Sequence, residues 1–191
     1  MDPRGDASRL REELRALDEA LYVALAGVRT PTLDTGMRAL SRAADKSALW
    51  LGIAGTMAVL GGPKARRAAL GGVAAIGLAS ATVNIVAKRA FPRGRPDRNG
   101  SGVPLSRHVS MPASSSFPSG HSASAFAFAE GVAATKPLLG AGLRVLAGAV
   151  AYSRVHTGVH FPGDVAAGVL LGLSAGKVGS FAASRLIPST S

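Results

Sequence analysis

Residues 153–164 read SRVHTGVHFPGD and place an arginine, two histidines and an aspartate beside an otherwise apolar segment. Asp164 lies four positions after His160, where its carboxylate can accept a hydrogen bond from one imidazole nitrogen and leave the other nitrogen bare. A bare imidazole nitrogen is a nucleophile when a phosphorus atom is held in front of it. The segment therefore predicts nucleophilic chemistry at His160, with Arg154 as a neighbouring cation.

A second cluster, KRAFPRGRP at residues 88–96, supplies two cations for binding phosphate. The guanidinium of Arg95 matches phosphate oxygens in a bidentate manner, and Lys88 adds a point charge. Together with Arg154, these cations predict a phosphate cradle. Other arginines of this part of the chain are typical of lipid headgroup anchors, and two of them, Arg98 and Arg107, also suit a second phosphate. The candidate anchors are Arg89, Arg93, Arg98 and Arg107.

The third cluster, PSGH at residues 118–121, predicts the start of a helix. Ser119 suits the N-cap position, and Gly120 permits close approach to the backbone. Free amide groups at a helix start bind anions, so both residues are candidates for phosphate binding. His121 then lies in the first turn, where it can protonate a leaving oxygen.

The histidines also allow a metal interpretation. His156, His160 and Asp164 are four residues apart in sequence and are all metal-ligating types. Gly158 and Pro162 interrupt the regular helix that would carry all three, so we expect no metal and no cofactor. His156 either lines the pocket or replaces an aromatic side chain, and His108 is expected to take no part.

The composition indicates an all-α integral membrane bundle that positions these clusters. Apolar residues make up 47% of the 191 residues, charged residues 17%, and cysteine is absent. Spanning about 30 Å of hydrocarbon takes about 20 residues. We expect about five transmembrane helices, from the apolar segments 47–62, 68–87, 119–134, 138–153 and 164–184.

A soluble all-α protein with alanine-rich buried helices is the alternative, because Glu130, Arg144 and Lys177 interrupt three of the segments. In a membrane we expect Glu130 and Arg144 to face each other, since a charge facing lipid is costly. Small residues at Gly168, Gly172 and Gly176 form a stripe that suits helix packing in lipid, within one chain or between two copies of it.

The N-terminal part differs from the rest. Residues 8–28 alternate leucines and charges as an amphipathic helix, too polar to span a bilayer and suited to its surface. We therefore expect an interfacial region at 1–46 and a transmembrane domain at 47–187. Because successive spans alternate in direction, the three clusters are delivered to the same membrane face.

The formal net charge of +11 is compatible with nucleic acid, a membrane surface or an anionic substrate. With two tyrosines, one tryptophan and no periodic basic helix, we expect no nucleic-acid partner. The expected partners are membrane lipids and a lipid-linked phosphate, with association of two copies left open.

The ordered clusters together resemble the type 2 phosphatidic acid phosphatase superfamily, whose pattern is K-x6-R-P, then P-S-G-H, then S-R-x5-H-x3-D. Every position of the pattern is filled, by Lys88, Arg95 and Pro96, by residues 118–121, and by Ser153, Arg154, His160 and Asp164. The resemblance implies that His160 forms a phosphohistidine, that Asp164 orients it and that His121 is the general acid. It implies a phosphate cradle without metal, formed by Lys88, Arg95, Ser119, Gly120 and Arg154.

The implied activity is that of a membrane phosphatase acting on a lipid-linked phosphomonoester or pyrophosphate. Polyprenyl-linked substrates are favoured, including polyprenyl diphosphate and polyprenyl-phosphoryl sugar phosphate. Phosphatidic acid and phosphatidylglycerol phosphate are the alternatives. Haloperoxidase chemistry with bound vanadate and a basic membrane-surface binding protein are more remote.

The resemblance also implies that the site lies near the extracytoplasmic face of the membrane. Integral members of the superfamily usually have six spans, and here the first is reduced to an amphipathic helix. The site side carries the larger number of Lys and Arg outside the motifs, which the positive-inside rule assigns to the cytoplasm. The charges therefore leave the orientation open.

Overall fold

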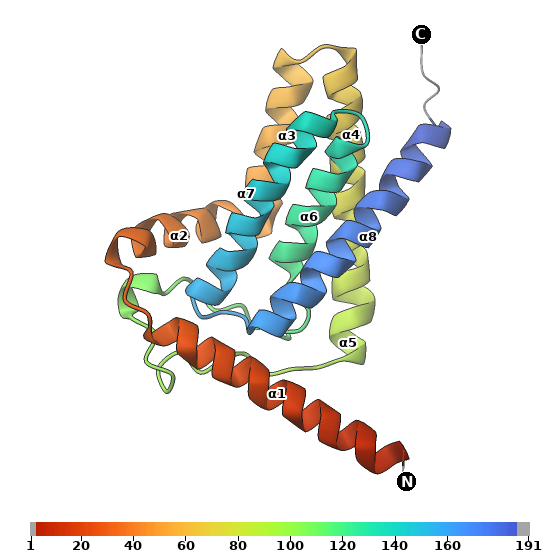
Figure 1. The fold of residues 1–191 in the computed structure, drawn as a ribbon. Coiled ribbons are helices and arrows are strands. Elements are labelled where there is room, and N and C mark those ends of the chain that lie inside the picture. Colours follow the sequence, from red (N-terminus) through yellow and green to blue (C-terminus); the bar gives the residue numbers. More distant parts are fainter. Residues whose placement is uncertain (1–2, 187–191) are drawn as a thin grey trace.

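The computed structural model describes residues 3–186, and this range contains helices and no strand. Figure 1 shows a bundle of steep helices with a long helix crossing one end. Residue 187, the expected end of the transmembrane domain, lies outside the described range. The elements are α1 (Pro3–Gly27), α2 (Pro31–Ala43), η1 (Asp45–Ser47), α3 (Ala48–Leu60), α4 (Pro63–Ala81), η2 (Thr82–Ala87), α5 (Lys88–Ala90), η3 (Leu105–Arg107), α6 (Gly120–Ala133), α7 (Pro137–His156) and α8 (Pro162–Leu186).

The five predicted apolar helices are present as α3, α4, α6, α7 and α8. Prolines begin α4, α7 and α8. Proline lacks an amide hydrogen, and an amide at the first position of a helix makes no hydrogen bond within the helix, so proline costs nothing there. Within residues 3–186, three helices are long and apolar enough to cross a membrane, namely Pro63–Ala90, Pro137–His156 and Pro162–Phe181. With 13 and 14 residues, α3 and α6 are shorter than a full span. A complete crossing by these two helices stays a prediction.

The centre of the bundle is α6, which packs against α4, α7 and α8. The approach is close because small residues face each other. A Cβ on Gly172 of α8 would lie 2.4 Å from the carbonyl oxygen of Ala123, and one on Gly131 of α6 would lie 2.6 Å from that of Gly71. The glycine stripe of α8 thus serves packing within the chain.

The two charges predicted to pair inside the bundle do so. Arg144 Nε of α7 lies 2.6 Å from Glu130 Oε1 of α6. The main aromatic contact of the bundle joins Trp50 of α3 and Phe128 of α6, whose ring centroids are 5.6 Å apart. Alanines are frequent among the buried residues of this core, as expected for packing driven by close backbone approach.

All three motif clusters lie at the same end of the bundle, as the alternation of spans predicts (Figure 1). The α4–α6 loop, the α7–α8 loop and η1 meet there, and α1 crosses beneath them. Helix α1 is amphipathic, with Tyr22 and Ala26 buried against the protein. Leu10, Leu14 and Leu17 are each 56% exposed on it.

The assignment of Arg107 as a headgroup anchor or as a binder of a second phosphate is wrong. Its side chain is 1% exposed, and its Nε donates to Asp34 Oδ1 of α2 over 2.8 Å. It also donates to backbone carbonyls at the end of α1, among them those of Ala26 and Val28. Because acceptors around its guanidinium belong to α1 and α2, Arg107 joins the loop between α4 and α6 to the N-terminal helices.

Candidate active site

His160 is held in the α7–α8 loop with its two ring nitrogens in different surroundings. Its Nδ1 lies 3.5 Å from Asp164 Oδ2 and 3.4 Å from Ser116 Oγ. Its Nε2 lies 3.3 Å from Arg95 Nη1. A guanidinium can only donate hydrogen bonds, so Nε2 is the acceptor and the imidazole proton resides on Nδ1, towards Asp164. This arrangement is the one that the predicted nucleophile requires, with the lone pair on Nε2.

The protonation state of His160 agrees with this arrangement. Burial lowers the pKa of His160 to about 4, the hydrogen bond with Asp164 opposes the shift, and Arg95 and Arg154 add to it. The imidazole is therefore neutral near pH 7. Asp164 is fully buried and also accepts from Phe161 N over 2.9 Å, which fixes the carboxylate at the start of α8.

Of the cations predicted as a cradle, Arg95 lies beside His160 Nε2, and Lys88 contacts Ser114, which Arg95 also contacts. Arg95 Nη1 donates to Val159 O over 2.8 Å beside the nitrogen, and its Nε donates to Ser114 O over 3.0 Å. Lys88 Nζ lies 3.1 Å from Ser114 Oγ and 3.1 Å from Asn84 Oδ1. Asn84 belongs to the π-helical segment η2, a widened turn of the kind often found at functional sites.

Arg154 is a buried cation with an unused donor. Its side chain is 1% exposed, and Nη1 contacts Ser41 and lies 3.7 Å from Asp45 Oδ1. Among the described residues, its Nε is a buried polar atom without a hydrogen-bond partner. An unpaired buried guanidinium N–H is costly, and a phosphate oxygen would satisfy it.

The PSGH cluster forms the start of α6, as predicted. Ser119 is the N-cap, and its Oγ accepts a hydrogen bond from Ser122 N over 3.4 Å. Its hydroxyl is therefore engaged in capping, and the amide of Ser119 donates to Asp164 O over 2.9 Å. Gly120 and His121 follow and line a cavity of about 210 Å³ that Lys88 also lines.

His121 contacts an acid that sequence reasoning missed. Its Nε2 lies 2.9 Å from Asp45 Oδ1, in the short helix η1 that precedes α3. The same carboxylate oxygen faces Arg154, so Asp45 lies between the predicted general acid and the cradle. No motif marks this aspartate. It is 76 residues from His121 in sequence, and only the fold brings the two together.

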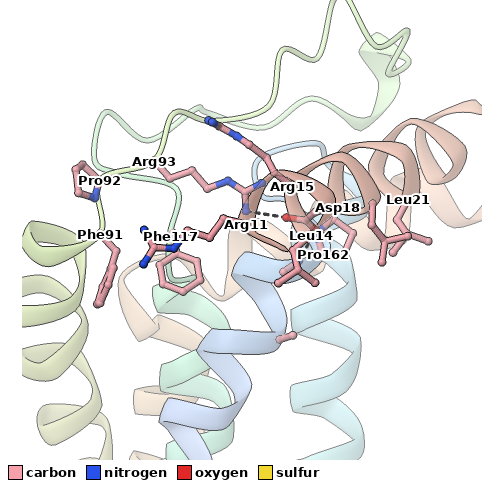
Figure 2. Close-up of a pocket in the computed structure, with 13 residues that line it drawn as sticks. Arg11, Leu14, Arg15, Asp18, Leu21, Phe91, Pro92, Arg93, Phe117 and Pro162 are labelled. Carbon is pink, nitrogen blue, oxygen red and sulfur yellow. Dashed lines mark hydrogen bonds and ion pairs between the residues drawn. The ribbon is translucent and has the colours of Figure 1, made fainter. Parts of the chain in front are cut away.

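A second missed pair lies behind His160. Arg93 Nη1 is 2.9 Å from Asp164 Oδ1 and 2.7 Å from Asp18 Oδ2 of α1, so Arg93 is an internal ion-pair partner and the headgroup assignment is wrong. Asp18 Oδ1 also accepts from Gly163 N over 2.7 Å. Figure 2 shows Arg93 and Asp18 in the wall of an apolar groove of about 750 Å³ under α1.

His156 lies outside the group of residues around His160. Its Nε2 lies 2.9 Å from Asp34 Oδ1, in the buried cluster around Arg107. Within residues 3–186 no group of three or more His, Asp or Glu side chains is arranged to hold a metal ion. His108 contacts Val103 O over 3.1 Å in the motif loop, at a distance in sequence from the three clusters.

Comparison with known proteins agrees with the order of the motifs. The model of the PAP2 superfamily matches residues 68–185. The chain belongs to the PAP2 superfamily. A decaprenylphosphoryl-5-phosphoribose phosphatase of Mycolicibacterium smegmatis is 38% identical over 149 residues, which are 78% of this chain and 77% of that protein. One from Mycobacterium tuberculosis is 35% identical over 153 residues, covering 79% and 81% of the two chains.

Solved membrane phosphatases of this PAP2 superfamily share the fold. A phosphatidylglycerolphosphate phosphatase from Bacillus subtilis matches with a TM-score of 0.70 and 26% identity over 92% of this chain and 89% of that one. LpxE from Aquifex aeolicus matches with a TM-score of 0.66 and 27% identity over 85% and 94%. The predicted family, helical membrane fold and reaction class are thereby confirmed, and the chain is a membrane lipid phosphate phosphatase.

Proposed function

We propose that this PAP2 phosphatase hydrolyses the terminal phosphomonoester of a polyprenyl-linked sugar phosphate through a phosphohistidine at His160. The observation that carries the mechanism is the pair of contacts of the His160 ring, with Nδ1 towards Asp164 and Nε2 towards Arg95. One nitrogen is oriented by an acid, and the other is open to an anion held by the surrounding cations.

In the first step, the lone pair of His160 Nε2 forms a bond to phosphorus while the bond to the leaving oxygen breaks. His121 acts in its doubly protonated form and gives one proton to that oxygen, and Lys88, Arg95 and Arg154 balance the charge on the phosphoryl oxygens. In the second step, a water gives a proton to His121, its oxygen attacks phosphorus, and the bond to Nε2 breaks. Inorganic phosphate then leaves.

The remaining residues of the predicted site are assigned by their positions. Asp164 keeps the Nδ1 proton directed towards itself and orients the ring. Gly120 presents the amide groups at the start of α6 to the phosphate, and Ser119 supports them as the N-cap. The cations provide the charge that a metal supplies in other phosphatases, so we propose that the reaction needs neither metal nor cofactor.

The substrate class rests on the relatives. The curated relatives of the chain are named decaprenylphosphoryl-5-phosphoribose phosphatases, and the match extends over more than three quarters of each chain for the Mycolicibacterium protein. Phosphatidylglycerol phosphate is the second candidate, because the Bacillus phosphatase named for it shares the fold over 92% of this chain.

The test is phosphate release by detergent-purified protein in the presence of chelator. The substrates are polyprenylphosphoryl-5-phosphoribose, polyprenyl monophosphate, polyprenyl diphosphate and phosphatidylglycerol phosphate, with His160→Ala beside the wild type. We expect release to be fastest with the sugar phosphate, unaffected by chelator and absent in the variant. Equal release by His160→Ala, or none from any substrate, would overturn the proposal.

We also propose that the site end of the bundle faces the extracytoplasmic side, with residues 1–46 lying on that surface. The exposed leucines of α1 support an interfacial position of this region. The chain has no cysteine, so single cysteines at exposed positions can report the side. With a membrane-impermeant maleimide on intact cells, Ala113→Cys in the exposed motif loop at the site end should react, and Lys64→Cys at the opposite end should not. The reverse pattern would place the site in the cytoplasm.

A further inference from the structure

The cavity beside His121 has walls that the reaction at His160 does not use. It has a volume of about 210 Å³ and lies between η1, the end of α4 with η2, and the start of α6. Because His121 gives its proton to the leaving oxygen, this cavity is where the atoms attached to that oxygen must lie. Its lining residues are Ala44, Lys46, Ser47, Ser80, Asn84, Lys88, Gly120, His121 and Ser124.

Three hydroxyl groups of this wall are unused. The side chains of Ser47, Ser80 and Ser124 come from three different elements and make no hydrogen bond within the described residues. Ser124 is only 6% exposed. Ser47 and Ser80 are partly exposed, so their hydroxyl groups and that of Ser124 are open to whatever fills the cavity. A ligand that carries hydroxyl groups would pair with all three.

The backbone of η1 is strained where it forms this wall. Lys46 has φ of 52° and Ser47 has φ of 60°, the left-handed conformation that residues other than glycine rarely adopt. This turn directs Asp45 onto His121 and Arg154 and brings Ser47 to the cavity. Strain of this kind persists where a functional arrangement requires it.

We infer that this cavity is a leaving-group subsite for a neutral sugar, placed between the phosphoryl group and the lipid chain. The inference rests on the proposed function and names the residues that recognise the sugar of the substrate. When the substrate binds, the leaving oxygen takes the place of Asp45 Oδ1 beside His121. The freed carboxylate, which is half exposed, then accepts hydrogen bonds from sugar hydroxyls, together with Ser47 and Ser124.

Two lysines line the cavity, Lys88 on the side of the cradle and Lys46 at the outer edge, and Asp45 contacts His121 between them. The carboxylate of Asp45 favours a sugar over a second phosphate next to the leaving oxygen. The leaving group of a polyprenyl diphosphate is an anionic phosphate, which would lie next to the carboxylate of Asp45 and be repelled. Lys46 is exposed at the outer edge, where it suits the phosphodiester that follows the sugar in a polyprenylphosphoryl sugar. The order anion, neutral sugar, anion thus matches the cradle, the subsite and Lys46.

The experiment compares substrates within each variant, so that general losses cancel. For Ser47→Ala and Ser124→Ala, the measured quantity is kcat/KM for polyprenylphosphoryl-5-phosphoribose divided by that for polyprenyl monophosphate. We expect this ratio to fall about fivefold in each variant, the size of one lost hydrogen bond. Ser110→Ala, an exposed serine of the motif loop, is the control and should keep the wild-type ratio.

Asp45→Asn removes the repulsion and provides an independent readout. We expect kcat/KM for polyprenyl diphosphate, divided by that for the sugar phosphate, to rise about tenfold. Ratios unchanged in all three variants, with the wild type active on the sugar phosphate, would overturn the subsite and leave the proposed function standing. A wild type inactive on every lipid phosphate would instead overturn the proposed function itself.

Discussion

The ion pair behind the nucleophile yields a sharp prediction, that Arg93→Ala lowers kcat with little change in KM. Arg93 contacts Asp164 and Asp18 and does not touch the cradle. Its loss leaves the fully buried carboxylate of Asp164 without its cation. Asp164 still accepts hydrogen bonds from Ser116 and Phe161 N. We therefore expect His160 to shift its position and to keep its contact with Asp164.

The magnitude follows from the burial of the pair. The Arg93 side chain is 17% exposed and that of Asp164 is 0% exposed, with 2.9 Å between the charged atoms. Removing one partner of a buried ion pair costs about 3–5 kcal/mol of stability. A displacement of the nucleophile by about 1 Å costs about 100-fold in rate. We therefore expect kcat to fall by about 10- to 100-fold and KM to change by less than about threefold.

The assay is steady-state phosphate release from the preferred substrate, with folding monitored by thermal melting in detergent. Arg89→Ala is the matched control, because Arg89 is an exposed cation of the same motif. Asp18→Asn should show the same kind of kcat loss to a smaller degree, with Glu19→Gln as its control on α1. If folded Arg93→Ala retains the kcat of Arg89→Ala, the ion pair does not position the nucleophile.

Three further predictions concern the protonation of His160, the packing of α8 against α6, and the contacts of Arg107 with the N-terminal helices. In protein labelled with 15N-histidine, the His160 ring should stay neutral down to about pH 5, because burial holds its pKa near 4, and protonation near pH 6.5 would contradict this. The same spectra should show the proton of the neutral ring on Nδ1, and a proton on Nε2 would contradict the tautomer assignment. Gly172→Ala should destabilise the bundle by about 1–3 kcal/mol because its Cβ would meet the backbone of α6, whereas Gly148→Ala, which meets nothing within 4 Å, should not lower the melting temperature. Arg107→Ala should cost about 3–5 kcal/mol by leaving buried acceptors unpaired, and an equal melting temperature for it and for exposed Arg42→Ala would refute this.

The parts of the fold that follow from hydropathy were predictable from the sequence. Apolar segments bounded by prolines and glycines gave the helices of the bundle, and the alternation of their directions brought the three motifs to one end. The pair of Glu130 and Arg144 was predictable because an unpaired charge among apolar helices is costly. The extents of α3 and α6 followed as well, because the apolar segments 47–62 and 119–134 became the helices Ala48–Leu60 and Gly120–Ala133.

The contact between His160 and Asp164 was predictable because the two residues lie four positions apart. Asp45 and Asp18 were not, because they lie outside the motifs in polar N-terminal segments where aspartate is common. Each meets its partner across about 75 residues of sequence, a relation that only the packed fold establishes. Arg93 was assigned to the surface because composition alone does not separate a headgroup anchor from a buried ion-pair partner.

The central claim is that the phosphoryl group passes through His160. The most direct measurement is a rapid quench of turnover with substrate labelled with 32P in its terminal phosphate, followed by mapping of the labelled peptide. We expect a base-stable, acid-labile phosphohistidine at His160 that is absent in His160→Ala and that accumulates in His121→Gln when the leaving group needs no proton. Label on another residue, or steady turnover by His160→Ala, would contradict it.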